Sequence, residues 1–381
     1  MRIRVAILTL YYKNSNYGGV LQAYALQKAL AKIGCEAKQI SYQLESGYKK
    51  SNILYRVIRG IYRKFMFLFN IKWYIKRTQH EKQIYEFAES IPHTKVVDVN
   101  SINNLSYDFD MFVCGSDQIW NPIGWQSTLF LDFVPEDKYK TSYAASVARD
   151  NLDKKELDFI KKNLYKFKAV SVREERTAEL LNEYINDKHI DVMPDPTILL
   201  TKDEWTEVIA PRLEKDPYIF AYFLGNEFKQ REQAINYAKE RNLKIIFIPY
   251  LRKDMYSWDI NHLIYMKEGI GVPEFLSLIK NAEEVVTDSF HGAVFSAIFE
   301  KQMWILTRFK KNDARSMNSR LDTLVHELGI ESRLISEFNN EQFIDDIDMK
   351  NVTKKMDSLK EKGVSYLKYH VEESNKCLKN Y

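Results

Sequence analysis

The stretch Glu-Glu-Val-Val-Thr-Asp-Ser-Phe-His-Gly at residues 283–292 predicts a β-strand that ends in a polar turn carrying a histidine. Helix-forming residues 293–299 follow at once, so the turn joins a strand to a helix. Such a turn places its side chains at the open end of a sheet, beside the unpaired N–H groups of the next helix. His291 is therefore a candidate for anion binding and proton transfer. The alternative is that His291 caps the helix or fills a gap in the packing.

The same alternation of strand and helix runs through the whole chain. The chain opens with a strand at residues 4–10, a helix that ends at Gly34 and a second strand at 38–42, which together predict a parallel sheet. Further strands are expected at residues 110–114, 140–146, 169–174, 189–193, 218–223, 244–248 and 302–306. The pattern predicts an α/β protein with two Rossmann-like doubly wound domains that face a cleft, an arrangement that resembles the GT-B architecture.

The domain limits follow from breaks in this pattern. Residues 1–205 are expected to form the N-terminal domain, residues 206–338 the C-terminal domain, and residues 339–381 a helical tail that packs back on both. A helical insertion is expected at about residues 48–90, where the α/β alternation is interrupted.

Charge is unevenly distributed along the chain. The formal net charge is +4, which does not indicate a nucleic-acid-binding protein. Residues 49–82, however, hold ten Lys or Arg and one acid, Glu81, which is a local net charge of +9. The rest of the chain is therefore net negative. The stretch at residues 49–82 is amphipathic and rich in aromatic residues. It is expected to form ordinary helices that cover the sheet, and the functional alternative is contact with an anionic membrane surface.

The cysteines, histidines and N-terminus narrow the class of protein further. Three cysteines far apart in sequence argue against a disulfide scaffold and suit a reducing compartment. The seven histidines show no metal-ligand spacing, so no metal is expected. The apolar start lacks a cleavage site, and no apolar run is long enough to span a bilayer. A cytoplasmic location is the expectation, with peripheral contact at the inner face of the membrane as a further alternative.

Six motifs in order resemble those of the polysaccharide pyruvyl transferase family. They lie at residues 16–26, 114–121, 143–146, 171–174, 195–197 and 287–292. The resemblance implies a GT-B-like fold and a metal-independent reaction without a cofactor. In that reaction the enolpyruvyl part of the co-substrate phosphoenolpyruvate is transferred to two hydroxyls of a sugar, and phosphate is released. The sugar belongs to a surface polysaccharide or to its lipid-linked precursor.

The resemblance also assigns residues to the donor. Arg173 matches the family's arginine at this strand end, and its guanidinium suits a carboxylate or a phosphate. The alternative for Arg173 is a salt bridge to a neighbouring carboxylate. His291 matches the motif histidine and is the candidate general acid, which protonates the methylene carbon of the donor. Phe290 and Gly292 flank His291 and are placed in the donor site with it.

One departure from the family pattern concerns the donor contact. Better-described relatives have Arg-Leu-His where this chain has Ser289, Phe290 and His291. Arg320 or Arg315 is expected to supply the missing charge. The helix N–H groups, with Ser289 donating, are an alternative holder of the phosphate. A third interpretation is that the departure marks a subgroup with a different donor.

The acceptor site is expected on the loops of the N-terminal half. Asn16, Gly18 and Gly19 are assigned to the cleft, where glycine lets the backbone approach a ligand. The alternative is a tight turn that needs glycine. Asp117 and Trp120 are candidate sugar contacts, because a carboxylate accepts from hydroxyls and an indole stacks on a sugar ring. The alternative for both is that they anchor the loop.

Two further carboxylates are expected to have structural roles. Asp195 lies between two prolines and is interpreted as structural rather than catalytic. Asp288 either orients His291 or caps the following helix, and capping is favoured.

Two other functions remain open at this point. The first is a glycosyltransferase of the same fold that uses a nucleotide sugar. The second is a non-catalytic protein that binds a glycan or a membrane through the basic stretch.

Overall fold

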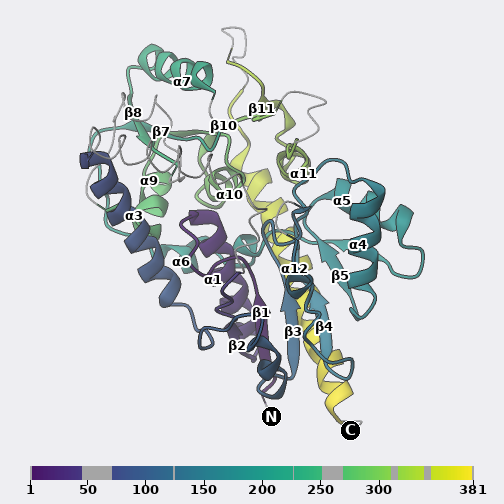
Figure 1. Cartoon of the computed structure of the whole chain (residues 1–381). Coiled ribbons are helices and arrows are strands. Elements are labelled where there is room, and N and C mark those ends of the chain that lie inside the picture. Colours follow the sequence, from purple (N-terminus) through teal and green to yellow (C-terminus); the bar gives the residue numbers. More distant parts are fainter. Residues whose placement is uncertain are drawn as a thin grey trace, which may run out of the picture.

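The protein is an α/β molecule built on two separate parallel sheets, one above the other in Figure 1. The computed structural model describes residues 2–44, 71–122, 125–225, 227–250, 269–309, 316–338 and 345–379. Most of the basic stretch at residues 49–82, and Arg315, lie outside the described residues.

The first sheet carries the N-terminal half of the chain. Its strand order is β2-β1-β3-β4, and all its pairings are parallel. The strands are β1 (Arg4–Leu8), β2 (Glu36–Gln39), β3 (Met111–Cys114) and β4 (Tyr139–Ser142). A parallel pair, β5 (Val170–Val172) and β6 (Ile190–Val192), joins the β4 edge through single bridges. The central strands β3 and β4 are buried throughout, as expected where helices cover both faces of a parallel sheet.

The second sheet carries the C-terminal half. Its order is β11-β10-β9-β7-β8, again with every pairing parallel. The strands are β7 (Tyr218–Tyr222), β8 (Lys244–Ile248), β9 (Glu284–Thr287), β10 (Gln302–Leu306) and β11 (Leu334–Ile335). The expected α/β architecture of two parallel sheets is therefore confirmed.

The helices connect or cover these strands. The α-helices are α1 (Tyr17–Lys32), α3 (Ile71–Glu89), α4 (Lys154–Leu164), α5 (Glu175–Tyr184), α6 (Lys202–Thr206), α7 (Phe228–Glu240), α9 (Val272–Lys280), α10 (Phe290–Ile298), α11 (Ser319–Leu328) and α12 (Met349–Lys379). Short 3-10 helices are η1 (Ile102–Tyr107), η3 (Ser127–Phe130), η4 (Pro196–Leu199) and η5 (Glu331–Arg333). Within the described ranges, none of the helices combines the length and the apolar character needed to cross a membrane.

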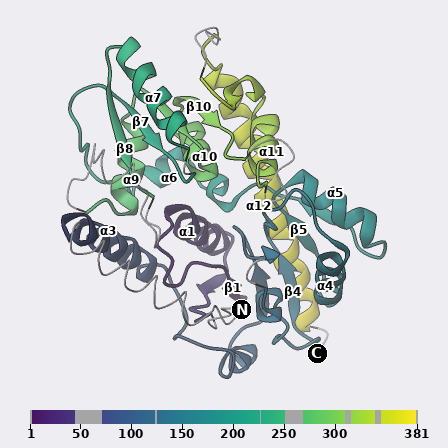
Figure 2. The ribbon, with the colours of Figure 1, turned by 45° about the horizontal axis from the view of Figure 1, so that its top comes forward.

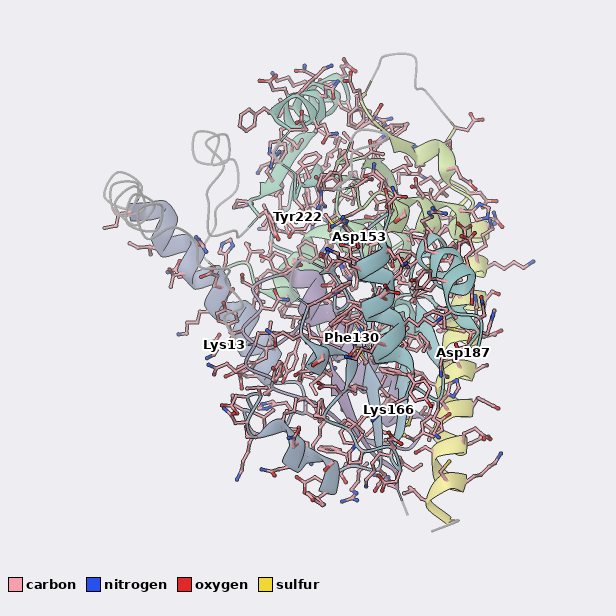
Figure 3. All side chains as sticks on the ribbon, turned by 45° about the vertical axis from the view of Figure 1, so that its right-hand side comes forward. Lys13, Phe130, Asp153, Lys166, Asp187 and Tyr222 are labelled. Carbon is pink, nitrogen blue, oxygen red and sulfur yellow. The ribbon has the colours of Figure 1, made fainter. Side chains whose placement is uncertain are left out.

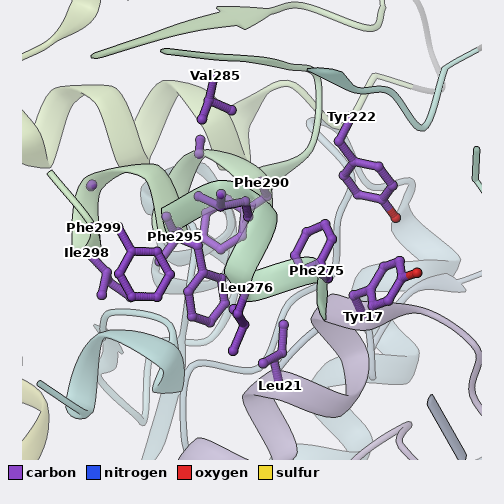
Figure 4. Packing of buried hydrophobic residues seen from close by; sticks show 14 of the residues in the cluster. Tyr17, Leu21, Tyr222, Phe275, Leu276, Val285, Phe290, Phe295, Ile298 and Phe299 are labelled. Carbon is purple, nitrogen blue, oxygen red and sulfur yellow. The ribbon is translucent and has the colours of Figure 1, made fainter. Parts of the chain in front are cut away.

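One part of the contact between the two halves is a continuous apolar core. Helix α1 of the first half packs against α9 of the second, as Figure 2 shows. The ring of Tyr17 stacks on Phe275 with centroids 4.4 Å apart, and the Tyr17 hydroxyl donates to the Ile270 carbonyl at 2.6 Å. Leu21 and Leu276 belong to the same fully buried cluster (Figure 4). This packing holds the two sheets in one relative orientation.

Helix α12 crosses from one half to the other. It contacts α10 and α11 of the second half, and η4 and β4 of the first (Figure 1). Near its C-terminal end the Tyr366 hydroxyl donates to the Ser142 carbonyl at 3.1 Å. The Tyr139 hydroxyl and His370 Nδ1 lie 2.8 Å apart. The end of the chain therefore packs on the first sheet.

Two leucines on α12 test how much this packing stabilises the protein. Leu367 is 1% exposed, whereas Leu378 is 41% exposed. We expect Leu367→Ala to lower the free energy of unfolding by about 2–5 kcal/mol, the range for a buried leucine. Leu378→Ala should change it by less than about 0.5 kcal/mol. Chemical denaturation of both variants measures the difference, and equal effects would mean that α12 is not docked in solution.

Candidate functional site

The turn between β9 and α10 is organised by its own side chains. Ser289 is the N-cap of α10, and its hydroxyl accepts from the backbone N–H of Gly292 at 3.2 Å. Asp288 instead accepts from the N–H groups of Leu224 at 2.6 Å and Gly225 at 2.7 Å. The expectation that Asp288 caps the helix is therefore wrong, because its carboxylate faces the loop after β7.

Gly292 occupies a position that does not accept a side chain. A Cβ atom built on it would lie 2.6 Å from Thr287 Oγ1. The glycine thus allows the first turn of α10 to pack closely against the end of β9. This packing role accounts for Gly292 without a donor contact.

The glycine loop of the first half reaches the histidine of the second. Asn16 is the N-cap of α1, and its side chain accepts from the N–H of Gly18 at 3.0 Å. A Cβ atom on Gly18 would lie only 2.0 Å from His291 Nδ1. On Gly19 a Cβ atom would lie 3.6 Å from Asp117 Oδ2. The structure therefore brings Asn16, Gly18 and Gly19 to the same place as His291.

Arg173 lies at the centre of a buried charge cluster at this junction. Its Nη1 donates to Asp195 Oδ2 at 2.7 Å, and its Nε lies 3.3 Å from Glu174 Oε1. Asp117 Oδ1 is 3.8 Å from Nη2. Burial lowers the pKa of Arg173, but these carboxylates raise it by more, so the guanidinium is held in its charged form. The salt-bridge alternative for Arg173 is thus realised.

Phe290 adds an aromatic contact to Arg173 across the junction. The centroid of its ring lies 4.3 Å from the guanidinium carbon. The neighbouring His291 presents Nε2 to Asp195 Oδ2 at 3.6 Å. Arg173 and Asp195 come from the first half and Phe290 and His291 from the second, so the cluster forms only when the halves are joined.

Asp195 is the carboxylate that sequence reasoning placed in a structural role. Its Oδ1 accepts from the N–H of Thr197 at 3.0 Å, and its Oδ2 accepts from Ser116 Oγ at 3.3 Å. Burial raises the pKa of Asp195, but the His291 and Arg173 charges lower it further, so the net pKa is well below the usual range. The position of Asp195 between two prolines does not predict its contacts with Arg173 and His291, because both residues are distant from it in sequence.

Two buried nitrogen atoms at the junction, Arg173 Nη2 and His291 Nε2, have no hydrogen-bond partner within the described part of the chain. Arg320 of α11 is also buried, and its Nε makes a single long contact, 3.3 Å to the Met317 carbonyl. Burial, together with the nearby charges of Arg173 and Arg308, lowers the pKa of Arg320 to about 10. These groups are a natural set of contacts for an anion.

Arg308, at the end of β10, was not identified from the sequence. Its Nη2 donates to the Asp288 carbonyl at 3.0 Å, and its Nε lies 3.4 Å from Asp288 Oδ2. A single arginine after a predicted strand does not by itself indicate a functional site. Its place near Arg320 arises only from the sheet order.

The side chains of Trp120 and Asp117 have different surroundings in the structure. Trp120 is fully buried, stacked on Phe130 with centroids 5.1 Å apart, and its Nε1 donates to the Leu129 carbonyl. Phe130 is labelled in Figure 3. The indole face is thus covered, which fits loop anchoring and not stacking on a sugar. Asp117 lies beside Arg173 instead.

No group of three or more His, Cys, Asp or Glu side chains is placed to hold a metal ion among the residues that the structure describes. Cys114 is fully buried in β3, and burial raises the pKa of its thiol. The side chains that meet at the junction are guanidinium groups, carboxylates and one imidazole.

The contact between Gly18 and His291 can be measured by a double-mutant cycle. We expect Gly18→Ala to lower the free energy of unfolding by about 1–3 kcal/mol, because the new methyl group collides with the imidazole. The same substitution in a His291→Ala background should cost much less, since the ring is gone. An equal cost in both backgrounds would contradict the contact.

Asp195 predicts a specific dependence of stability on pH. Its pKa is lower in the folded protein than in the unfolded chain, so it stabilises the fold above about pH 4 and less as the pH falls. Asp195→Asn should cost about 3 kcal/mol at pH 7, the effect of breaking a buried ion pair. The difference between wild type and variant should narrow as the pH is lowered below about 4. A difference that is constant with pH would show that Asp195 is not a charged partner.

Comparisons with known proteins identify the family from the sequence and similar folds among solved structures. A family model described as polysaccharide pyruvyl transferase matches residues 16–308. No curated protein matches the chain. A structure described as a UDP-N-acetylglucosamine 2-epimerase from Listeria monocytogenes has a TM-score of 0.53 and 11% identity, covering 96% of this chain and 91% of that one. The glycosyltransferase SnogD from Streptomyces nogalater has a TM-score of 0.46 and 9% identity, covering 100% of both chains.

At this identity the likeness to the Listeria structure concerns the fold alone. The family model, in contrast, covers well over half of the chain and includes Arg173, Asp195 and His291. The protein therefore belongs to the polysaccharide pyruvyl transferase family, which is a family of transferases.

Proposed function

We propose that the protein is a ketal pyruvyltransferase that uses phosphoenolpyruvate as donor and a sugar diol as acceptor. A proton adds to the methylene carbon of the donor, and the two sugar oxygens bond to C2 as the C2–O bond to phosphate breaks. Of the two hydroxyl protons, one balances the new methyl group and the other leaves with phosphate. The product is a cyclic ketal that retains the pyruvyl carboxylate.

The observation that carries this proposal is the set of buried, unsatisfied nitrogen donors at the junction. Arg173 Nη2 and His291 Nε2 lack hydrogen-bond partners among the described residues. An unsatisfied buried donor is costly, and a ligand that supplies an acceptor removes the cost. A donor substrate with both a carboxylate and a phosphate supplies several charged acceptors at once.

Arg320 supports an anionic donor by a different argument. No carboxylate of the described residues lies within ion-pair distance of it, and Arg173 and Arg308 add like charge nearby. A guanidinium in this setting is stabilised by a bound anion. Arg320 thus supplies the charge that the family motif carries in its arginine, at the position where this chain has Ser289. Ser289 itself is committed to capping α10.

His291 is the group proposed to deliver the proton. An imidazole titrates near neutral pH and can act as both acid and base. Asp195, with Oδ2 3.6 Å from Nε2, is the group that orients the ring. The contact of the ring with Gly18 holds it from the other side.

The proposed acceptor is a free sugar or a lipid-linked glycan, as the resemblance implies. Cytoplasmic location and contact with the membrane through residues 49–82 remain predictions from the sequence, because most of that stretch lies outside the described residues.

Thermal unfolding of the purified protein tests the donor. Titrating phosphoenolpyruvate and a panel of nucleotide sugars separately should give a saturable rise in Tm with phosphoenolpyruvate, because it binds the folded state. A rise with nucleotide sugars alone would identify a glycosyltransferase of the same fold. No rise with either, together with tight binding to vesicles or glycans, would identify a non-catalytic binding protein.

Arg320 separates a binding role from a structural one. We expect Arg320→Met to unfold at a Tm no lower than that of wild type, since the removed charge has no carboxylate partner. Its affinity for phosphoenolpyruvate should fall at least about tenfold, the effect of losing a charged hydrogen bond. The matched control is Arg333→Met, a buried arginine stacked on Trp304, which should keep the affinity. A lower Tm with unchanged affinity for phosphoenolpyruvate would mean that Arg320 stabilises the fold and does not bind the donor.

His291 is tested by turnover. With phosphoenolpyruvate and an acceptor, phosphate release by His291→Ala should fall about 10²–10⁴-fold, the usual contribution of a general acid. The control is His189→Ala, whose side chain is 79% exposed in wild type. Circular dichroism of both variants verifies folding. A rate near that of wild type in folded His291→Ala would remove the acid role.

A further inference from the structure

A cavity of about 630 Å³ lies between α5 of the first half and α11 of the second. Its walls carry the carboxylates of Asp150, Glu175, Glu179 and Asp322, together with serine, threonine and asparagine side chains. This volume is large enough for a small ligand. Neither Arg173 nor His291 lines it.

The walls of this α5–α11 cavity are joined by specific hydrogen bonds. The N–H of Asp150 donates to the Ser316 carbonyl at 3.2 Å, and the N–H of Ser319 donates to Asp150 Oδ1 at 3.3 Å. On the other side, the N–H of Glu175 donates to Thr323 Oγ1 at 3.3 Å. These contacts bridge the two halves, so the cavity is formed before any ligand arrives.

The cavity adjoins the proposed donor site along both of its walls. Glu175 begins α5 only two residues after Arg173. On α11, Arg320 lies between the lining residues Ser319 and Asp322. The lining segments follow β4, β5 and β10, at the carboxyl ends of parallel strands, where open α/β sheets bind ligands.

The α5–α11 cavity carries a net negative charge. Four carboxylates and the single guanidinium of Arg176 leave three negative charges when His326 is neutral. Arg176 is already paired, with Nη1 3.1 Å from Glu179 Oε2. Burial raises the pKa of Asp322, and the nearby Asp150 raises it as well. A phosphate or pyrophosphate group is repelled by such a surface, whereas hydroxyl groups donate to it.

A second observation points to a ligand with hydrogen-bonding groups. Ser319, which lines the cavity, is 7% exposed, and its hydroxyl has no hydrogen-bond partner within the described ranges. A buried hydroxyl can both donate and accept. A polyol in the cavity would satisfy Ser319 and the carboxylates together.

We propose that the α5–α11 cavity is the acceptor site, and that it holds neutral, hydroxyl-bearing pyranose rings of the glycan while excluding any phosphate-bearing end. This proposal rests on the proposed function, because it places the acceptor beside the phosphoenolpyruvate site. It differs from the acceptor site expected from the sequence, since none of Asn16, Gly18, Gly19, Asp117 and Trp120 lines the cavity. The free nitrogen atoms of Arg173 and His291, with Arg320, then receive the anionic donor, and the carboxylate-lined cavity receives the diol. The negative charge of the cavity keeps the anionic donor out of it.

Direct binding of simple sugars tests the cavity. Methyl β-galactopyranoside and methyl α-mannopyranoside are the probes, titrated into the full-length protein and followed by saturation-transfer NMR. We expect at least one glycoside to bind wild type. The variants Asp322→Lys on α11 and Glu179→Lys on α5 should raise the Kd of that glycoside at least about tenfold, the effect of losing one charged hydrogen bond. The matched control is Glu183→Lys, which makes the same change of charge at an exposed position of α5 outside the cavity and should bind like wild type.

Inorganic pyrophosphate serves as the anionic probe in the same titrations. It should not displace the glycoside from wild type. The proposal is overturned if neither glycoside binds wild type, if the two cavity variants bind as wild type does, or if pyrophosphate competes. Phosphoenolpyruvate is titrated in parallel by thermal unfolding. A missing phosphoenolpyruvate shift with intact glycoside binding contradicts the proposed donor and not the cavity, whereas the reverse result contradicts the cavity alone.

Discussion

The contact between Gly18 and His291 is the constraint around which the site is built. Only a residue without a side chain can bring the start of α1 this close to the imidazole, because a Cβ atom would lie 2.0 Å from Nδ1. The close approach is possible because Tyr17, next to Gly18, is stacked on Phe275 in the core that joins the halves. The packing of the two halves and the geometry of the candidate site thus depend on the same few residues at the start of α1.

The apolar core between the two halves restrains this arrangement. Rotation of one half by a small angle would separate Asp195 from His291 and Arg173 from Phe290, pairs whose members come from different halves. The buried rings of Tyr17 and Phe275 resist such rotation, because exposing them costs hydrophobic free energy. Helix α12, which contacts both halves, adds a second restraint.

The arginines at the junction divide into two kinds. Arg173 is surrounded by Asp117, Glu174 and Asp195, so its removal would leave buried carboxylates without a partner and would destabilise the fold. Arg320 has no such partner in the described chain, and its pKa is lowered by burial and by neighbouring positive charge. The fold therefore needs Arg173 whether or not a substrate is present, whereas Arg320 is the residue for which we propose a role in binding the donor. The same reasoning separates a structural ion pair from a binding group in any buried cluster.

The sequence by itself determined the two-sheet α/β fold, the strand-to-helix turn at His291 and the family, because hydrophobic periodicity and ordered motifs are local signals. It also brought Arg173, Arg320 and the glycine loop into consideration. Only the tertiary structure decided which residues meet. Asp195 became the partner of Arg173 and His291, Asp288 turned to the loop after β7, and Trp120 entered the core. Those outcomes depend on contacts between residues far apart in the chain, and such distances are set by the order of strands and by the packing of α1 on α9, which no local pattern encodes.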